Sequence, residues 1–347
     1  MKKIFALILA LVMVMSLAAC GGSKMPSTDE QDSTKNGEVV FDKEVTLKWG
    51  IASSANSGPT EADAMAIKLI NERSNGMITI DYYPDGVLGN SPDLLEQVLD
   101  GTLDICGCGI AEVDSYTTTL DILDLPFLVG SNEATILFSD EWQALINQAS
   151  DELGAYIAGT LGFGSRDFIT VDKPIRTLAD MKGMNIRTVT TDVVVDATKL
   201  LGANPVNVAF TELYTALSSG MIDGIENNIT TMNAIGLLDS VKYCTRMNFY
   251  PYVALDVVGE HLKDSLPVGY YDLIVECIAE SCKWWAEEGC AAWEKNSLDA
   301  AVAAGVEIIE MEDAAMQEIR DTMAPLYEKY SAKSEANAAF IAYCQGL

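Results

Sequence analysis

The sequence predicts an α/β fold with two lobes, and three observations support this prediction. Strand and helix signals alternate from residue 45 to residue 106, and the alternation begins afresh at Arg166 and continues to residue 225. Alternating β and α segments are typical of parallel sheets with helical crossovers. The chain has 347 residues, which is enough to bury a core in each of two lobes. A helical pattern from Pro267 to about Ala304 is long enough to span both lobes.

The N-terminus carries the pattern of an export signal. Lys2 and Lys3 precede an apolar run that is too short for a transmembrane helix. The segment that follows, Leu17-Ala18-Ala19-Cys20-Gly21, resembles a bacterial lipobox, which implies that residues 1–19 are removed and that Cys20 carries lipid. Residues 20–43 are mostly small and polar, so we expect a lipidated flexible tether.

Five elements are predicted in the first lobe before residue 106. Apolar and polar residues alternate in the strands, whereas apolar residues recur three and four positions apart in the helices. Asn75-Gly76 suits the left-handed end of the first helix, and Ser91 is expected to cap the second. In chain order the elements are a strand over residues 45–51, a helix over 61–73, a strand over 77–83, a helix over 91–99 and a strand over 103–106.

A second series of elements follows a break at Leu125-Pro126-Phe127. A helix over about 132–153 leads to a strand over 155–163 that leaves the first lobe. Thr177 and Thr211 are expected as helix caps beyond it. The second lobe then contains strands over residues 168–171, 184–189, 206–208 and 221–225, with helices over 192–201 and 212–219.

The last third of the chain is predicted to pass between the lobes. Residues 241–258 are interpreted as strands that return toward the first lobe, and the long helix follows them. A strand over 306–309 and helices over 313–330 and 334–344 complete the chain. We therefore expect lobe I to comprise residues 44–164 plus about 253–292, and lobe II to comprise residues 165–252 plus about 293–347.

Composition and motifs exclude several functional classes. A formal net charge of −29 repels nucleic acid, so no nucleic-acid partner is expected. His261 is the only histidine and the cysteines show no zinc spacing, so we expect no metal and no cofactor. Nucleophile-elbow, phosphate-loop and dinucleotide motifs are missing from the sequence, which predicts that the protein is not an enzyme. Asp104, Asp121 and Asp124 are interpreted as solvated carboxylates, and the seven cysteines after Cys20 as mostly buried free thiols.

Arg187 is the strongest single candidate for a binding residue. It lies in the strand pattern 184–189, so if Ile186 faces the core, Arg187 faces away from it, toward the carboxyl end of a parallel strand. Ligands of open α/β sheets bind at that edge. A guanidinium matches a carboxylate with two parallel hydrogen bonds, although a structural ion pair with one of the 51 acidic residues is the alternative.

Several motifs together resemble the extracytoplasmic solute-binding proteins of tripartite ATP-independent periplasmic (TRAP) transporters, the C4-dicarboxylate-binding type. The resemblance covers about residues 45–330 in order. In the first lobe it rests on Ser74-Asn75-Gly76, Tyr83-Pro84, Leu88-Gly89, Gly101-Thr102-Leu103-Asp104 and Leu125-Pro126-Phe127. In the second lobe it rests on Arg166, Pro174-Ile175, Asp180-Met181-Lys182-Gly183, Ile186-Arg187, Gly202-Ala203-Asn204-Pro205-Val206, Phe210-Thr211-Glu212-Leu213-Tyr214 and Asp223-Gly224-Ile225-Glu226-Asn227.

The resemblance implies a periplasmic-binding-protein-like fold that closes on a carboxylate ligand in a cleft between the lobes. It assigns the ligand carboxylate to Arg187, with Arg166, Asn227 and Glu226 beside it and Phe210 at the cleft. The segments expected to select the ligand, 53–59 and 106–112, follow no subfamily pattern, and Asn228 replaces a proline common in the family.

The implied function is capture of a small organic acid and its delivery to the integral membrane subunits of a TRAP transporter. The lipobox implies an extracytoplasmic protein held on the membrane by lipid, on a Gram-positive surface or in a periplasm. A ligand-presenting sensor, an ABC-importer binding protein and a secreted enzyme acting on small acids remain the alternatives.

Overall fold

The computed structural model describes residues 34–35, 38–117, 119–130 and 133–347. The chain divides into two units, Met1–Val40 and Phe41–Leu347. In the first unit, β1 (Thr34–Lys35) pairs antiparallel with β2 (Glu38–Val39), within the predicted tether. The predicted signal peptide and Cys20 lie outside the described residues. The fold and the site that follow belong to the second unit.

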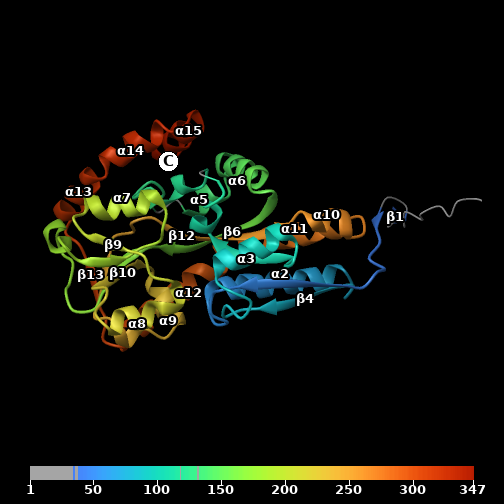
Figure 1. Ribbon diagram of the computed structural model, residues 1–347, viewed down its shortest axis with the longest axis horizontal. Helices are drawn as coiled ribbons and strands as arrows, with labels where there is room; N and C mark the ends of the chain where they lie inside the picture. Colours follow the sequence, from blue (N-terminus) through green and yellow to red (C-terminus); the bar gives the residue numbers. More distant parts are fainter. Residues whose placement is uncertain (1–33, 36–37, 118, 131–132) are drawn as a thin grey trace, which may run out of the picture. The chain divides into compact units, whose positions relative to one another are not determined.

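The second unit contains two mixed sheets with helices around them (Figure 1). The five-stranded sheet has the order β4-β3-β5-β12-β6, and the six-stranded sheet has the order β13-β11-β7-β10-β8-β9. The strands of the first sheet are β3 (Val45–Ile51), β4 (Ile78–Tyr83), β5 (Ile105–Gly109), β6 (Ala155–Ser165) and β12 (Pro251–Gly259). Those of the second are β7 (Asp167–Thr170), β8 (Asn185–Arg187), β9 (Asn204–Val206), β10 (Gly224–Asn227), β11 (Tyr243–Arg246) and β13 (Glu307–Glu310).

The predicted α/β fold with two lobes is confirmed, but the predicted parallel sheets are in fact mixed. β3, β4 and β5 pair in parallel, as do β8, β9 and β10. β12 runs antiparallel to both β5 and β6, and β7 runs antiparallel to both β10 and β11. The chain crosses from one sheet to the other along these strands and returns. Each sheet therefore also contains strands that are antiparallel to those joined by helical crossovers.

Helices follow the predicted order with shifted ends. Asn90 rather than Ser91 precedes α3, the predicted helix 132–153 is divided by the cap Ser139, and the predicted helix 313–330 is divided before Pro325. On the first sheet's part of the chain the helices are α2 (Gly58–Arg73), α3 (Ser91–Asp100), α4 (Ile110–Val113), α5 (Glu133–Leu137) and α6 (Asp140–Leu153). Beyond β7 they are α7 (Asp192–Leu200), α8 (Leu213–Ser218), α9 (Ile229–Ala234), α10 (His261–Ser265), α11 (Tyr270–Trp284), α12 (Cys290–Ala303), α13 (Asp313–Thr322), α14 (Ala324–Ser331) and α15 (Glu335–Gln345).

The predicted long helix is present and serves both sheets. α11 packs against α2 and β6, whereas α12 packs against α9 (Figure 1). The two are joined by a π-helical turn over Trp285–Gly289. A Cβ atom at Gly289 would lie 2.4 Å from the Trp285 ring, so glycine is the residue that allows this tryptophan to fold back on its own helix. Trp285 is buried and donates a hydrogen bond to the carbonyl of Gly162 on β6 at 2.9 Å.

The C-terminal helices contact both parts of the fold. α14 packs against α7, whereas α15 packs against α6, where the rings of Phe340 and Trp142 lie 5.9 Å apart. The segment assigned by prediction to lobe II, about 293–347, therefore reaches back to a helix of the first lobe. Among the helices of the described residues, none has the length and apolar character needed to cross a membrane.

Candidate functional site

Arg166 occupies the point where the chain passes from β6 to β7. Its backbone N–H donates to the carbonyl of Tyr250 at 2.8 Å, and its own carbonyl accepts from the N–H of Phe249 at 2.9 Å. Residues 249 and 250 lie just before β12, where the chain crosses back to the five-stranded sheet. Two crossings are thus hydrogen-bonded to each other at Arg166, and this fixes the side chain between the sheets.

The guanidinium of Arg166 is already paired inside the protein. Its Nε forms an ion pair with Oε1 of Glu226 on β10, and its Nη2 donates to the Glu226 carbonyl at 3.1 Å. The rings of Tyr252 and Tyr250 flank it, with centroids 4.9 and 5.5 Å from its central carbon. Burial opposes the charged form, but the Glu226 carboxylate raises the pKa of Arg166 above its ordinary value. Arg166 stays charged, and Glu226 compensates that charge.

Arg187 differs from Arg166 in lacking such a partner. It is the last residue of β8, and because Ile186 packs in the core, Arg187 points to the other side. Its side chain is only 8% exposed, and its Nε donates to the carbonyl of Val208 at 3.1 Å. Within the described part of the chain no carboxylate lies at ion-pairing distance from it. Burial, and then the positive charge of Arg166, lower the pKa of Arg187. A buried guanidinium in this state favours an anion from outside the chain.

Asn227 and Phe210 complete the side of the site that comes from the six-stranded sheet. Asn227 ends β10, and its side-chain oxygen accepts from the N–H of Asn228 at 2.9 Å, which leaves its NH₂ group to act as a donor. Asn228 caps α9 and donates to the carbonyl of Phe163 at 3.1 Å, so the residue that replaces the expected proline anchors this strand end to β6. Phe210 begins the turn after β9 and is half-buried.

These side chains line a cavity of about 500 Å³ at the carboxyl ends of parallel strands from both sheets. Its walls come from the segments after β3, β5, β8, β9 and β10 and from the crossing at Tyr250–Val253. The size is within the usual range for small-molecule sites. The lining residues are 52–53, 90–93, 109–112, 124, 166, 187–190, 207–210, 227 and 250–253.

Three carboxyl groups also line this cavity. Oδ2 of Asp93 accepts from the N–H of Asn90 at 3.1 Å, and Oε2 of Glu112 accepts from the N–H of Gly109 at 2.8 Å. Oδ2 of Asp124 accepts from the hydroxyl of Thr191 at 3.0 Å. Burial raises the pKa of Glu112, and burial raises the pKa of Asp124 to about 7.

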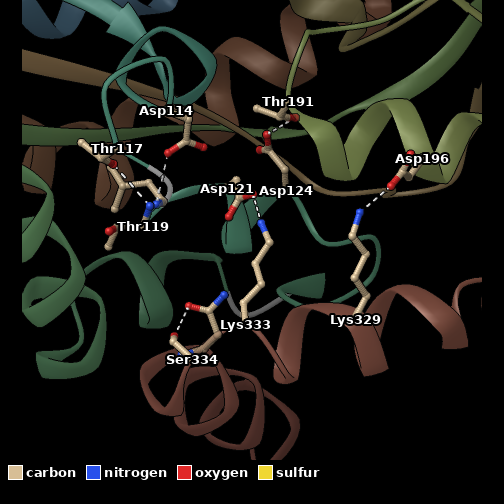
Figure 2. A network of polar contacts seen from close by, with 12 residues as sticks. Asp114, Thr117, Thr119, Asp121, Asp124, Thr191, Asp196, Lys329, Lys333 and Ser334 are labelled. Atoms are coloured by element: carbon tan, nitrogen blue, oxygen red, sulfur yellow. Dashed lines mark hydrogen bonds and ion pairs between the residues drawn. The ribbon is translucent and has the colours of Figure 1, made fainter.

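Asp124 belongs to a polar network that extends from the cavity to the C-terminal helices (Figure 2). Thr191 begins α7 and donates to Asp124, while Asp121 accepts from Lys333, after α14, at 2.7 Å. Lys329 of α14 pairs with Asp196 of α7 at 2.7 Å. The 121–124 turn is therefore held by α7 and by the segment after α14, which positions Asp124 at the cavity wall.

The interpretation of Asp104, Asp121 and Asp124 as solvated carboxylates is wrong for Asp121 and Asp124. Asp121 and Asp124 are each only 5% exposed, because the 121–124 turn is covered by α7 and by Lys333. Asp104 is partly exposed and pairs with His261 at 3.2 Å, and it also accepts from the N–H of Lys48 at 2.7 Å. The prediction of free thiols is confirmed for the described residues, where seven cysteines are free and only Cys290 is not fully buried.

The structure brings four of the five predicted ligand-binding residues to one cavity and places the fifth behind it. Arg187, Arg166, Asn227 and Phe210 line the cavity, whereas Glu226 is fully buried and contacts Arg166 instead. The expected selectivity segments contribute Ser53 and residues 109–112. Sequence reasoning missed Tyr250, Tyr252 and Asp124. The aromatic run 249–252 beside a predicted crossing was the available signal for the tyrosines.

Across the residues that the structure places, no three His, Cys, Asp or Glu side chains gather as a metal site would require. The expectation of a site without metal or cofactor stays a prediction. The polar groups at the cavity offer binding by charge and hydrogen bonds.

Comparisons with known proteins agree with this architecture. The profile of a family described as bacterial extracellular solute-binding proteins, family 7, matches residues 51–334. The 2,3-diketo-L-gulonate-binding periplasmic protein YiaO of Escherichia coli is 27% identical over 290 residues, which cover 80% of this chain and 86% of that protein. The C4-dicarboxylate-binding protein DctB of Bacillus subtilis is 24% identical over 317 residues, 86% of this chain and 88% of that protein.

The fold is also found among solved structures. The sugar acid binding protein DctPAm from Advenella mimigardefordensis, solved in complex with galactonate, has a TM-score of 0.82 to this chain at 23% identity. The match covers 88% of this chain and 99% of that chain. At this identity the likeness concerns the fold.

Proposed function

This chain belongs to the bacterial extracellular solute-binding proteins of family 7, and we propose that it captures a small organic acid by its carboxylate and delivers it to the membrane subunits of a TRAP transporter. The observation that carries the proposal is Arg187, a buried guanidinium at a cavity wall with no carboxylate partner among the described residues. A carboxylate is the planar anion that such a group binds with two hydrogen bonds.

The energies are sufficient for a transport protein. Each charge-assisted hydrogen bond contributes about 1.5–3 kcal/mol, and a micromolar dissociation constant needs about 8 kcal/mol in total. Two bonds from Arg187, a bond from the Asn227 amide and apolar contact with Phe210 reach that range together. Arg166, held by Glu226, adds donors beside Arg187, and Glu226 acts as a positioning residue rather than as a ligand contact.

Cleft closure follows from the way the cavity is assembled. Its walls come from both sheets, so the two sheets and their helices would close on the ligand as lobes I and II, with hinges near Arg166 and Tyr250 where the chain crosses. The lobes comprise residues 44–164 plus about 253–292 and residues 165–252 plus about 293–347, with α15 on the first lobe's α6.

Calorimetry on Arg187 variants tests the carboxylate site. Native mass spectrometry of freshly purified protein identifies the retained acid, and galactonate, succinate and pyruvate serve as probes if the site is empty. Arg187→Lys keeps the charge but loses the planar pair of donors, so binding should weaken on the order of 100-fold, about 2.7 kcal/mol. Arg187→Met should abolish binding.

A matched control is Arg73→Met, which removes a guanidinium exposed on α2 and paired with Glu280 outside the cavity. Its affinity should equal that of the wild type. Equal affinity of Arg187→Met and wild type would rule out the assignment, as would the absence of binding to any carboxylate.

Catalysis has no part in this proposal. The retained acid should be released from the protein without chemical modification. Mass spectrometry of the acid before and after incubation at 37 °C checks this directly. A product of different mass would favour the alternative of a secreted enzyme.

The lipobox supports anchoring to the membrane. We propose that Cys20, after removal of residues 1–19, carries lipid and that residues 20–43 tether the binding unit outside the cell membrane. Cys20→Ser should move the protein from the membrane fraction to the soluble fraction without changing affinity for the acid. Retention of that variant in the membrane fraction would contradict the anchor.

A further inference from the structure

The charges that line the cavity have room for one carboxylate. Among the described residues that line the cavity, Arg166 and Arg187 are the only ones with cationic side chains. The ion pair with Glu226 compensates Arg166. Arg187 is the cation that remains without a carboxylate in the described part of the chain. The wall from the six-stranded sheet therefore offers a single uncompensated positive charge.

Acidic side chains line the same cavity. They are Asp93 on α3, Glu112 on α4 and Asp124 in the 121–124 turn, and we name these three residues the acidic wall. In each of the three, one carboxyl oxygen accepts a hydrogen bond from the protein. The donors are the N–H of Asn90 for Asp93, the N–H of Gly109 for Glu112 and the hydroxyl of Thr191 for Asp124. Glu112 accepts the shortest of these three hydrogen bonds, at 2.8 Å from the N–H of Gly109.

The acidic wall disfavours a second carboxylate on the ligand and favours a hydroxyl group. A second carboxylate on the ligand would meet these like charges, which costs free energy. A hydroxyl group would instead donate to a carboxylate oxygen, a charge-assisted hydrogen bond. Neutral polar side chains of the same cavity, from Ser53, Asn90, Thr190 and Asn207, can exchange further hydrogen bonds with hydroxyls.

Resting on the carboxylate function proposed above, we propose that the ligand is a hydroxylated monocarboxylate, such as an aldonate, and that Glu112 excludes acids with a second carboxylate. Glu112 accepts a ligand hydroxyl while Arg187 holds the carboxylate.

Protonation of the acidic wall sets the conditions of the test. Burial raises the pKa of Asp124 to about 7 and also raises the pKa of Glu112. A protonated wall could donate to a second carboxylate, so discrimination is measured at pH 8, where Asp124 is charged.

The experiment compares acids that differ only at the far end. Calorimetry at pH 8 measures gluconate against glucarate and galactonate against galactarate, because each second acid replaces a terminal hydroxymethyl group by a carboxylate. In the pair that binds, the wild type should prefer the monocarboxylate at least tenfold. Glu112→Gln removes the charge but keeps the shape, and it should reduce this preference about tenfold. Glu61→Gln, which removes an exposed acid on α2 outside the cavity, should leave the preference unchanged.

Each result decides one of the two proposals. Equal or tighter binding of the diacid, an unchanged preference in Glu112→Gln with wild-type melting temperature, or no binding of either aldonate overturns the monocarboxylate proposal. If succinate or malate binds and Arg187→Met abolishes that binding, the carboxylate function stands while this inference falls. If no carboxylate binds, both fall.

Discussion

Two buried arginines at one cavity differ because only one has an ion-pair partner among the described residues. Glu226 is fully buried, and its Oε1 pairs with Arg166, while no carboxylate of the described residues lies at ion-pairing distance from Arg187. Breaking a buried ion pair leaves an uncompensated charge, which costs far more than losing an exposed pair. The pairing therefore belongs both to the stability of the fold and to the selectivity of the site.

Glu226→Gln should lower the free energy of unfolding by about 3–5 kcal/mol, because Arg166 would remain buried and charged without its partner. Urea denaturation measures the change. The control is Asp172→Asn, which breaks the exposed pair with Lys242 and should cost under about 1 kcal/mol. Equal losses in the two variants would contradict the role given to Glu226.

The buried carboxyl group of Asp63 is expected to make the stability of the folded state depend on pH. It is buried on α2 and accepts from the hydroxyl of Tyr82, and its Oδ1 has no hydrogen-bond partner among the described residues. Burial raises its pKa from 3.8 to about 7, and the pKa of nearby Asp256 is raised by burial and by Asp63. The folded state therefore holds a proton that the unfolded chain loses near pH 4, so this group loses its stabilising effect as the pH rises from about 4 to about 7.

Asp63→Asn should flatten this dependence. The urea midpoint of the wild type should fall between pH 5 and pH 7, and the slope should shrink in the variant by up to about 1.4 kcal/mol per pH unit. Asp81→Asn, at an exposed position on β4, serves as control and should follow the wild type. Parallel curves for wild type and Asp63→Asn would contradict the prediction.

At the scale of elements, the π-helical turn between α11 and α12 makes one long helix serve two sheets. Trp285 packs within 5.6 Å of the Phe163 ring and 5.9 Å of the Trp293 ring, measured between centroids. Gly289 leaves the space that this packing needs. The turn therefore ties the helix to β6 close to the crossing at Arg166, where the proposed hinge lies.

Gly289→Ala tests this packing, because helix propensity and overlap with Trp285 predict opposite changes in stability. Helix propensity alone would make alanine more stable than glycine by about 1 kcal/mol. The overlap of the new Cβ with Trp285 should instead destabilise the protein by about 1–3 kcal/mol. Gly346→Ala, where the nearest atom would be 3.4 Å away, should stay within about 0.5 kcal/mol of the wild type. A higher melting temperature for Gly289→Ala would disprove the packing argument.

At the scale of the whole molecule, a net charge of −29 opposes the approach of an anionic ligand. The proposed site offsets this field locally, by a buried arginine in a cavity walled by both sheets. The long-range repulsion acts during approach and is screened by salt, whereas the contacts inside the cavity are screened much less.

Association should therefore become faster as salt is added. Stopped-flow fluorescence with the retained acid should show a rate constant that rises from 10 mM to 200 mM salt, as the Debye length falls from about 30 Å toward about 8 Å. The dissociation rate should change little. An association rate that falls with salt would show that the local field of Arg187 and Arg166 governs approach instead.

The sequence by itself determined the order of the main elements, the two-lobe organisation and the choice of Arg187 as a candidate. Strand alternation, helical periodicity and turn residues are local signals, so their positions can be read directly. Arg187 was found because one strand position beside a core residue must face away from the core. The same local logic predicts the export signal and the tether.

Only the tertiary structure decided the pairing of strands, the partner of Arg166 and the burial of Asp124. Glu226 lies 60 residues from Arg166, and Lys333 lies 212 residues from Asp121. No local pattern in a chain with 51 acidic residues indicates which of them become buried. Burial and ion pairing depend on which segments pack together, and that arrangement brings Arg187 and the three residues of the acidic wall to one cavity.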